Sequence, residues 1–172
     1  MKPAIVLAFV ILMTATAFAQ KENDRLQQSC GNRDIKLDVH TTKPATDPNV
    51  EAGKSQVYVV EIAEPAFPFD ARKITIRIGL DGKWVGAVKG THTYMQVAVT
   101  SGEHHLCAER QSVQASLERE AAFISFTAEP DQRYYFRARF TEHSGVKLDP
   151  VNADEGRLLI SSSRLTTSTP KR

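Results

Sequence analysis

The side chains best suited to chemistry in this chain are the two histidines and the cysteine of His104-His105-Leu106-Cys107. Histidine nitrogen and cysteine sulfur are preferred zinc ligands, but a zinc site needs three or four ligands converging on one point. Successive side chains of a strand point to opposite faces, so only His105 and Cys107 share a face here. Because two ligands do not suffice and Cys107 is expected in a disulfide, we predict neither a metal nor a cofactor site.

Other familiar catalytic patterns give no convergent set. The chain has no Gly-x-Ser-x-Gly turn of serine hydrolases and no His-Glu-x-x-His helix. Its five histidines are scattered, no carboxylate pair stands out for glycoside cleavage, and its glycines form no phosphate loop. Catalytic triads are geometric rather than local, so distant residues can still converge. We therefore expect a protein without enzymatic activity, and keep a hydrolase assembled from scattered residues as the alternative.

Aromatic and arginine side chains favour a binding role. Trp84 is predicted across from Gly79 and beside Arg77, away from the apolar face of its hairpin. Tyr135 and Arg137 share the face of an aromatic strand that is expected to be solvated. An exposed Trp84 would make these residues a contact surface for a protein or a glycan. The alternative roles of Trp84 are to cover the cross-strand glycine or to be buried under a second layer.

Two predicted β-hairpins would position the candidate side chains named above. Asp81-Gly82 separates two runs with strand chemistry and predicts a two-residue β-hairpin, and Ser101-Gly102 predicts a second one. The first hairpin pairs Leu80 with Lys83, Gly79 with Trp84, Ile78 with Val85, Arg77 with Gly86 and Ile76 with Ala87. The second hairpin places Met95, Val97, Val99 and Leu106 on one face and Tyr94, Gln96, Ala98, His105 and Cys107 on the other.

The rest of the chain reads as short strands separated by turns. Residues rich in β-branched and aromatic side chains predict strands over 35–39, 56–63, 121–128 and 132–141. Loops are predicted over 41–55 and 64–71, a linker over 111–120 and a turn over 129–132. Residues 154–161 fit a short helix or a final strand, and we lean to the helix. This pattern predicts a mostly β fold, an antiparallel β-sandwich of immunoglobulin-like or transthyretin-like character.

The N-terminal segment is typical of a secretory signal peptide. Lys2 precedes an apolar run over 4–17, and Ala17-Phe18-Ala19 is a small-x-small cleavage site. The run is short for a bilayer span, although an uncleaved anchor is the alternative. We therefore predict a periplasmic or secreted protein with no stable membrane insertion after cleavage. The predicted organisation is a signal peptide over 1–19, an N-terminal extension and loop over 20–55, a β-sandwich domain over 56–163 and a flexible tail over 164–172.

The cysteine content predicts a disulfide, and the charge content limits the classes of partner that the chain can bind. Cys30 and Cys107 are the two cysteines, and an even number in an exported chain favours one disulfide, with two unpaired thiols as the alternative. This bond would tie the N-terminal extension to a central strand. The chain has 22 Lys and Arg against 20 Asp and Glu, interspersed without a basic stripe. We therefore expect no nucleic-acid partner.

Four short motifs in order resemble a known family: Asp81-Gly82, Trp84-Val85-Gly86, Gly102-Glu103-His104-His105-Leu106-Cys107 and Tyr134-Tyr135-Phe136-Arg137. Over residues 57–141 the chain resembles exported bacterial domains catalogued as domain of unknown function 2846. Ser101 stands where that family often has proline, and no lipobox cysteine follows the apolar run. The resemblance implies a small β-sandwich at the periplasm or cell surface, with no established activity. The sequence thus predicts a non-enzymatic module of the cell envelope for binding or structural support, with an unknown envelope protein or glycan as partner.

Overall fold

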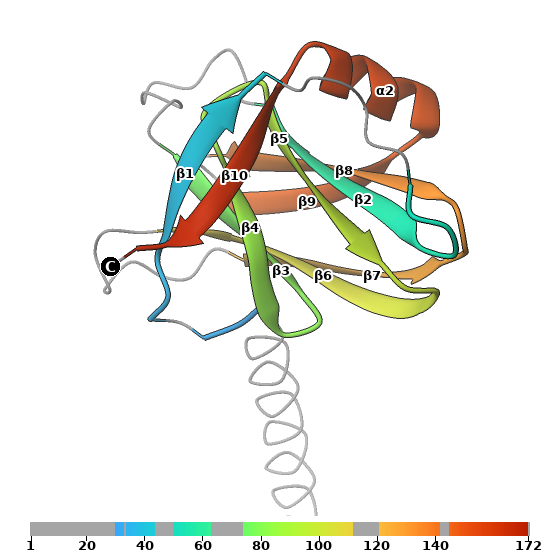
Figure 1. Cartoon of the computed structure of the whole chain (residues 1–172). Helices are drawn as coiled ribbons and strands as arrows, with labels where there is room; N and C mark the ends of the chain where they lie inside the picture. The colour runs from blue at the N-terminus through green and yellow to red at the C-terminus, as the bar shows by residue number, and fades with distance from the viewer. Residues whose placement is uncertain are drawn as a thin grey trace, which may run out of the picture.

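The computed structural model describes residues 30–32, 34–43, 50–62, 74–111, 121–141 and 145–171. These residues form two β-sheets that pack face to face around one apolar core (Figure 1). The predicted β-sandwich is therefore confirmed. The predicted signal peptide over 1–19, the loop over 64–71 and nearly all of the linker over 111–120 lie outside the described residues.

Ten strands and one helix are described. In chain order they are β1 (Leu37–Thr42), β2 (Ser55–Glu61), β3 (Thr75–Leu80), β4 (Lys83–Lys89), β5 (Thr93–Val99), β6 (Gly102–Arg110), β7 (Ala121–Ala128), β8 (Arg133–Thr141), β9 (Gly145–Val151), α2 (Ala153–Ser161) and β10 (Arg164–Pro170). The larger sheet has the order β1-β10-β5-β2-β8-β9, and the smaller sheet has the order β4-β3-β6-β7. Most neighbours are antiparallel, but the pairs β2–β8 and β5–β10 are parallel.

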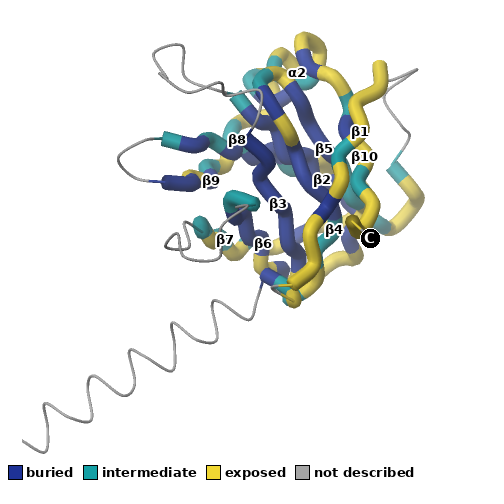
Figure 2. Tube along the Cα trace, turned by 90° about the vertical axis from the view of Figure 1, so that its left-hand side faces the viewer, coloured by how far each residue is buried: buried dark blue, intermediate teal, exposed yellow. Residues whose placement is uncertain are grey.

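Strand β2 lies at the centre of the larger sheet and is buried on both faces (Figure 2). Val57 and Val59 face the core between the sheets. Tyr58 and Val60 face outward into a second apolar cluster. This double burial explains the run of β-branched residues in β2.

Helix α2 covers the second cluster, and its formation confirms the helix that we favoured over a strand. The Asn152 side chain accepts a hydrogen bond from the Glu155 N–H at the helix N-terminus. Gly156 packs against the ring of Tyr135, and a Cβ at this position would lie 2.2 Å from Tyr135 Cγ. The helix can therefore lie this close to the sheet only with glycine at position 156.

The first hairpin has the predicted turn but not the whole predicted register. Leu80 pairs with Lys83 and Gly79 with Trp84, as predicted. A bulge then shifts the register by one residue, so the three remaining predicted pairs are wrong. The observed pairs are Ile78–Gly86, Arg77–Ala87 and Ile76–Val88. Bulges insert one extra residue into one strand and are common on edge strands such as β4.

The second predicted hairpin is wrong, although the faces of its residues are largely as predicted. Strand β5 pairs with β2 and β10 in the larger sheet, while β6 pairs with β3 and β7 in the smaller one. Ser101-Gly102 therefore carries the chain from one sheet to the other. Met95 and Leu106 still lie in the common core, because the inner faces of both sheets point there.

The predicted flexible tail over 164–172 is also wrong. Residues 164–170 form β10, which pairs with β1 along its length and with the start of β5. The Thr166 hydroxyl donates to the Ala87 carbonyl at 2.8 Å, and the Ala87 N–H donates to the Ser168 hydroxyl at 2.9 Å. These polar side chains join the two sheets along one edge. The sandwich therefore includes every described strand, from β1 at the start of the chain to β10 at its end.

Candidate functional site

Trp84 lies half-buried on the edge strand β4 and is held by two contacts. The guanidinium carbon of Arg77 lies 4.2 Å from the centroid of the indole ring, a cation–π arrangement. The indole Nε1–H donates a hydrogen bond to the carbonyl of Asn32 at 2.7 Å. The prediction that Trp84 lies beside Arg77 is confirmed, and its ring has a defined orientation.

Arg77 is a buried positioning residue rather than part of an exposed surface. Its side chain points into the outer layer of the smaller sheet, where Nη2 lies 2.7 Å from Oε2 of the buried Glu109. Its Nη1 donates to the carbonyl of Ile35. A buried charge is tolerated when it is paired and hydrogen-bonded in this way. Arg77 therefore links the tryptophan ring to the chain segment that precedes β1.

We call residues 30–32 and 34–37 the N-terminal strap, because they run across the outer face of the smaller sheet. The predicted disulfide between Cys30 and Cys107 is confirmed, with a Cα–Cα distance of 5.4 Å. A Cβ on Gly79 would lie 2.3 Å from the Cys30 carbonyl oxygen. The cross-strand glycine is thus covered by the strap backbone and not by Trp84, which lies against Gly31 instead.

The far end of the strap is fixed by Gln111. The Leu37 N–H donates to Gln111 Oε1 at 2.7 Å, and Gln111 Nε2 donates to the Leu37 carbonyl at 3.0 Å. This amide pair imitates the hydrogen bonding of a neighbouring strand. Together with the disulfide, it fixes both ends of the strap to the smaller sheet.

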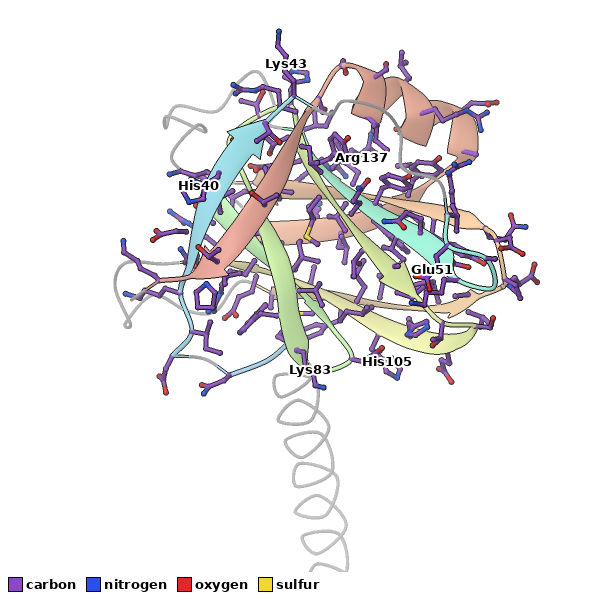
Figure 3. The ribbon with its side chains drawn as sticks, viewed as in Figure 1. His40, Lys43, Glu51, Lys83, His105 and Arg137 are labelled. Atoms are coloured by element: carbon purple, nitrogen blue, oxygen red, sulfur yellow. A yellow bond between two sulfur atoms is a disulfide. The ribbon has the colours of Figure 1, made fainter. Side chains whose placement is uncertain are left out.

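A groove of about 380 Å³ lies between the strap and the edge of β4. Ile35, Leu37 and Pro170 contribute to one wall, and Lys83, Trp84 and Val85 contribute to the other. Among the described residues that line the groove, Lys83 is the single charged one, and it stands at the β3–β4 hairpin (Figure 3). The described lining is therefore mainly apolar with one cation, as the lining of small-ligand sites usually is.

The hairpin that carries Lys83 is anchored by Asp81, which has a left-handed backbone with φ of 49°. Asp81 Oδ1 accepts the backbone N–H of His105 at 2.9 Å, and Oδ2 lies 2.8 Å from His104 Nδ1. His104 Nε2 lies 2.9 Å from the Thr100 carbonyl oxygen. Both partners of the imidazole are acceptors, so the arrangement favours the protonated ring, which donates from both nitrogens. Neither nitrogen is open to act as a general base in this arrangement.

Asp81 and His104 each stabilise the charged form of the other. Burial lowers the pKa of His104, but its hydrogen bonds to Asp81 and Thr100 and the nearby Asp81 charge outweigh burial and raise it overall. Burial raises the pKa of Asp81, but the hydrogen bonds from His105 and His104 and their charges lower it overall. The groove therefore lies beside a hairpin that is held in place by a charge-assisted hydrogen bond.

This pair predicts a pH-dependent stability. A raised pKa in the folded state means that the His104 contribution is complete below its ordinary value of 6.5 and disappears as the pH rises through the folded value. We expect the free energy of unfolding in urea to fall more steeply above pH 6.5 for the wild type than for His104→Gln. The difference between the two proteins isolates His104, because other titrating groups are common to both. Parallel curves would contradict the charged state of His104.

A second titratable group was missed by the sequence analysis. Glu61 ends β2, is only 2% exposed, and its Oε2 has no hydrogen-bond partner among the described residues. Burial raises the pKa of Glu61 to about 9, so the side chain is protonated at neutral pH. Its alternation with Val57 and Val59 places it on the core face of the strand, which was visible in the sequence.

The other predicted contact residues lie away from the groove. Tyr135 is buried under α2 and stacks on Tyr58 with a centroid distance of 5.1 Å. Arg137 is partly exposed, and its Nη1 lies 2.9 Å from Glu155 Oε1 on the helix (Figure 3). The predicted surface therefore divides into two parts, one on each sheet, and only Trp84 lines the groove.

The side chains of the segment His104-His105-Leu106-Cys107 are engaged in local contacts. His105 Nδ1 lies 2.8 Å from the Ser125 hydroxyl, and Cys107 is in the disulfide. Among the described residues, no group of three or more His, Cys, Asp and Glu side chains is arranged to hold a metal ion. No helix in the described part of the chain is long and apolar enough to cross a membrane.

Comparison with known proteins identifies no relative. No family model matches the chain, and neither a curated protein nor a solved structure matches it.

Proposed function

We propose that this protein is an exported, non-enzymatic β-sandwich module of the bacterial cell envelope that binds a ligand in the groove beside Trp84. The observation that carries this proposal is that both walls of the groove are fixed by contacts within the chain. The disulfide and Gln111 hold the strap, while Asp81 and His104 hold the hairpin. A preformed site loses less conformational entropy on binding, which favours affinity.

Export is supported by two features of the sequence and the fold. The N-terminal residues have the charge, apolar run and cleavage site of a secretory signal. A disulfide that joins the strap to β6 is typical of proteins in oxidising compartments. Membership of the domain of unknown function 2846 family is part of this proposal, because that family is exported and is not associated with an activity.

The lining defines the ligand that fits best. Ile35, Leu37 and Pro170 favour an apolar group, and Lys83 favours a negative charge beside it. Sugars usually stack on an open tryptophan face, but Arg77 already covers one face of Trp84. We therefore favour the apolar C-terminal residue of a partner protein, with its carboxylate at Lys83, over a glycan.

The single tryptophan of the chain gives a direct test. We expect the tripeptide acetyl-Ala-Val-Leu with a free carboxylate to produce a saturable change in Trp84 fluorescence. The amidated tripeptide, or the variant Lys83→Ala with the free acid, should bind at least about tenfold more weakly, which corresponds to loss of one ionic contact. The control Lys147→Ala removes an exposed lysine on β9 and should bind normally. No saturable change with the free acid, or equal binding by Lys83→Ala, would contradict the proposal, and binding of chitotriose instead would favour a glycan.

A further inference from the structure

Strand β7 is an edge of the smaller sheet and carries no charge. It pairs with β6 along its whole length, and no described strand pairs with its other side. Its sequence, Ala-Ala-Phe-Ile-Ser-Phe-Thr-Ala, has no charged residue, no proline and no glycine. Such an edge presents unpaired backbone groups that can accept another strand, and proteins usually protect it.

The other three sheet edges of the described chain carry such protection. The edge of β1 carries the exposed Asp38 and His40. The edge of β9 carries Lys147, Asp149 and Pro150. The edge of β4 begins and ends with exposed lysines and has its Ala87 backbone bonded to hydroxyls of β10. The lack of protection is therefore specific to β7.

Apolar side chains on both faces of β7 remain incompletely covered. Phe123 points to the outer face and is 36% exposed, one of the few large apolar side chains of the described residues with such exposure. Ile124 and Phe126 point inward and pack against the core, yet they are only partly buried. A strand added beside β7 would cover both faces at once and remove apolar surface from water.

We propose that β7 pairs antiparallel with β7 of a second copy of this chain, which joins the two smaller sheets into one continuous sheet. A two-fold axis places identical surfaces against each other, so any charge on the strand would approach its own copy. The neutral β7 avoids this repulsion. Pairing centred on Ile124 keeps every side chain on its own face and sets Phe123 opposite the partner's Ser125. The inference is independent of the groove, which lies at the opposite edge of the smaller sheet.

Sedimentation velocity of the mature, disulfide-bonded chain tests this dimer. We expect a monomer–dimer equilibrium over an about hundredfold range of protein concentration. Ser125 is exposed on β7, and Ser125→Lys should weaken self-association at least about tenfold because lysine charges the edge. The matched control Thr41→Lys adds the same charge to the exposed edge of β1 and should leave the dimer unchanged. Circular dichroism establishes that both variants are folded.

Hydrogen exchange of the wild-type chain gives a second measurement that needs no variant. Backbone amides of β7 should exchange more slowly as the protein concentration rises, while those of β1 should not change. A monomer at every concentration would overturn the proposal. A dimer that survives Ser125→Lys, or that is weakened equally by Thr41→Lys, would place the interface elsewhere and overturn it as well.

Discussion

Replacing both cysteines, in the variant Cys30→Ala/Cys107→Ala, is expected to lower the free energy of unfolding by about 4 kcal/mol. The disulfide closes a loop with a sequence separation of 77 residues, and this closure restricts the unfolded chain. Alanine is preferred to serine because Cys107 is buried, and a hydroxyl there would add a desolvation cost. Small domains have a total stability of roughly 5–15 kcal/mol, so this loss would be a large fraction of it.

The same variant should also open the groove. Cys30 anchors the start of the strap, and the neighbouring residues Gly31 and Asn32 contact the indole ring of Trp84. Loss of the anchor exposes the ring to water, so its fluorescence should shift to longer wavelength before global unfolding. The contacts of Arg77 and Gln111 hold the rest of the strap, so the remaining sandwich should keep its strand content.

Urea denaturation followed by circular dichroism and by Trp84 fluorescence measures both effects. The wild-type chain treated with a reductant serves as a control, because it should show the same loss of stability without any substitution. An alanine variant that unfolds at the same urea concentration as the oxidised wild type would contradict the stabilising role of the disulfide. A fluorescence spectrum that does not change would contradict the contribution of the strap to the groove.

The sequence predicted the parts of this structure that depend on local chemistry or on compartment. A two-residue hairpin turn requires backbone conformations with positive φ, which Asp81 and Gly82 tolerate. The turn and the two residue pairs nearest to it were therefore predicted correctly. The predicted export signal made a disulfide between Cys30 and Cys107 the natural expectation. The alternation of β8 correctly placed Tyr135 and Arg137 on one face, because strand periodicity does not depend on the neighbouring strand. The expectation that this face is solvated was wrong for Tyr135, because α2 covers it.

Features that depend on distant residues could not be predicted in the same way. Ser101-Gly102 can join two strands of one sheet or one strand of each sheet, and the alternation of the flanking residues is the same in both cases. The polar sequence of β10 is typical of a flexible tail. It forms a strand because the hydroxyls of Thr166 and Ser168 bond to the backbone of Ala87, which is distant in the sequence. The bulge in β4 was not predicted, although Gly86 stands beside it and glycine inside a strand often accompanies a bulge.

In the candidate site, too, the features set by local sequence were predicted and those set by distant residues were not. Trp84 and Arg77 were correctly placed together, because both lie on one predicted hairpin. The strap that completes the groove was not predicted, since its position depends on Cys30, Gln111 and Arg77 acting at a distance. The sequence predicted a strand at Glu61 but not which face the side chain takes, although its parity with Val59 places the carboxyl group in the core.

The variant Glu61→Gln is expected to stabilise the fold by about 3 kcal/mol at pH 7 and to have almost no effect at pH 4. The pKa of Glu61 is about 9 in the folded protein against an ordinary value of 4.5. At pH 7 folding must therefore protonate a carboxylate that is ionised in the unfolded chain, at about 1.4 kcal/mol for each unit of pH above 4.5. Below 4.5 the group is protonated in both states, so this contribution to stability is fully present there and is lost as the pH rises towards 9.

Urea denaturation of the wild type and of Glu61→Gln at both pH values measures the effect. Glutamine has nearly the shape of a protonated glutamate but does not ionise, so packing should be preserved while the protonation cost disappears. The matched control Glu103→Gln changes an exposed glutamate on β6 and should alter stability by less than about 0.5 kcal/mol at either pH. A stabilisation that is equal at pH 4 and pH 7 would show that packing, not ionisation, is the cause. A wild type as stable as Glu61→Gln at pH 7 would mean that the carboxyl group has a partner in solution and a pKa near its ordinary value.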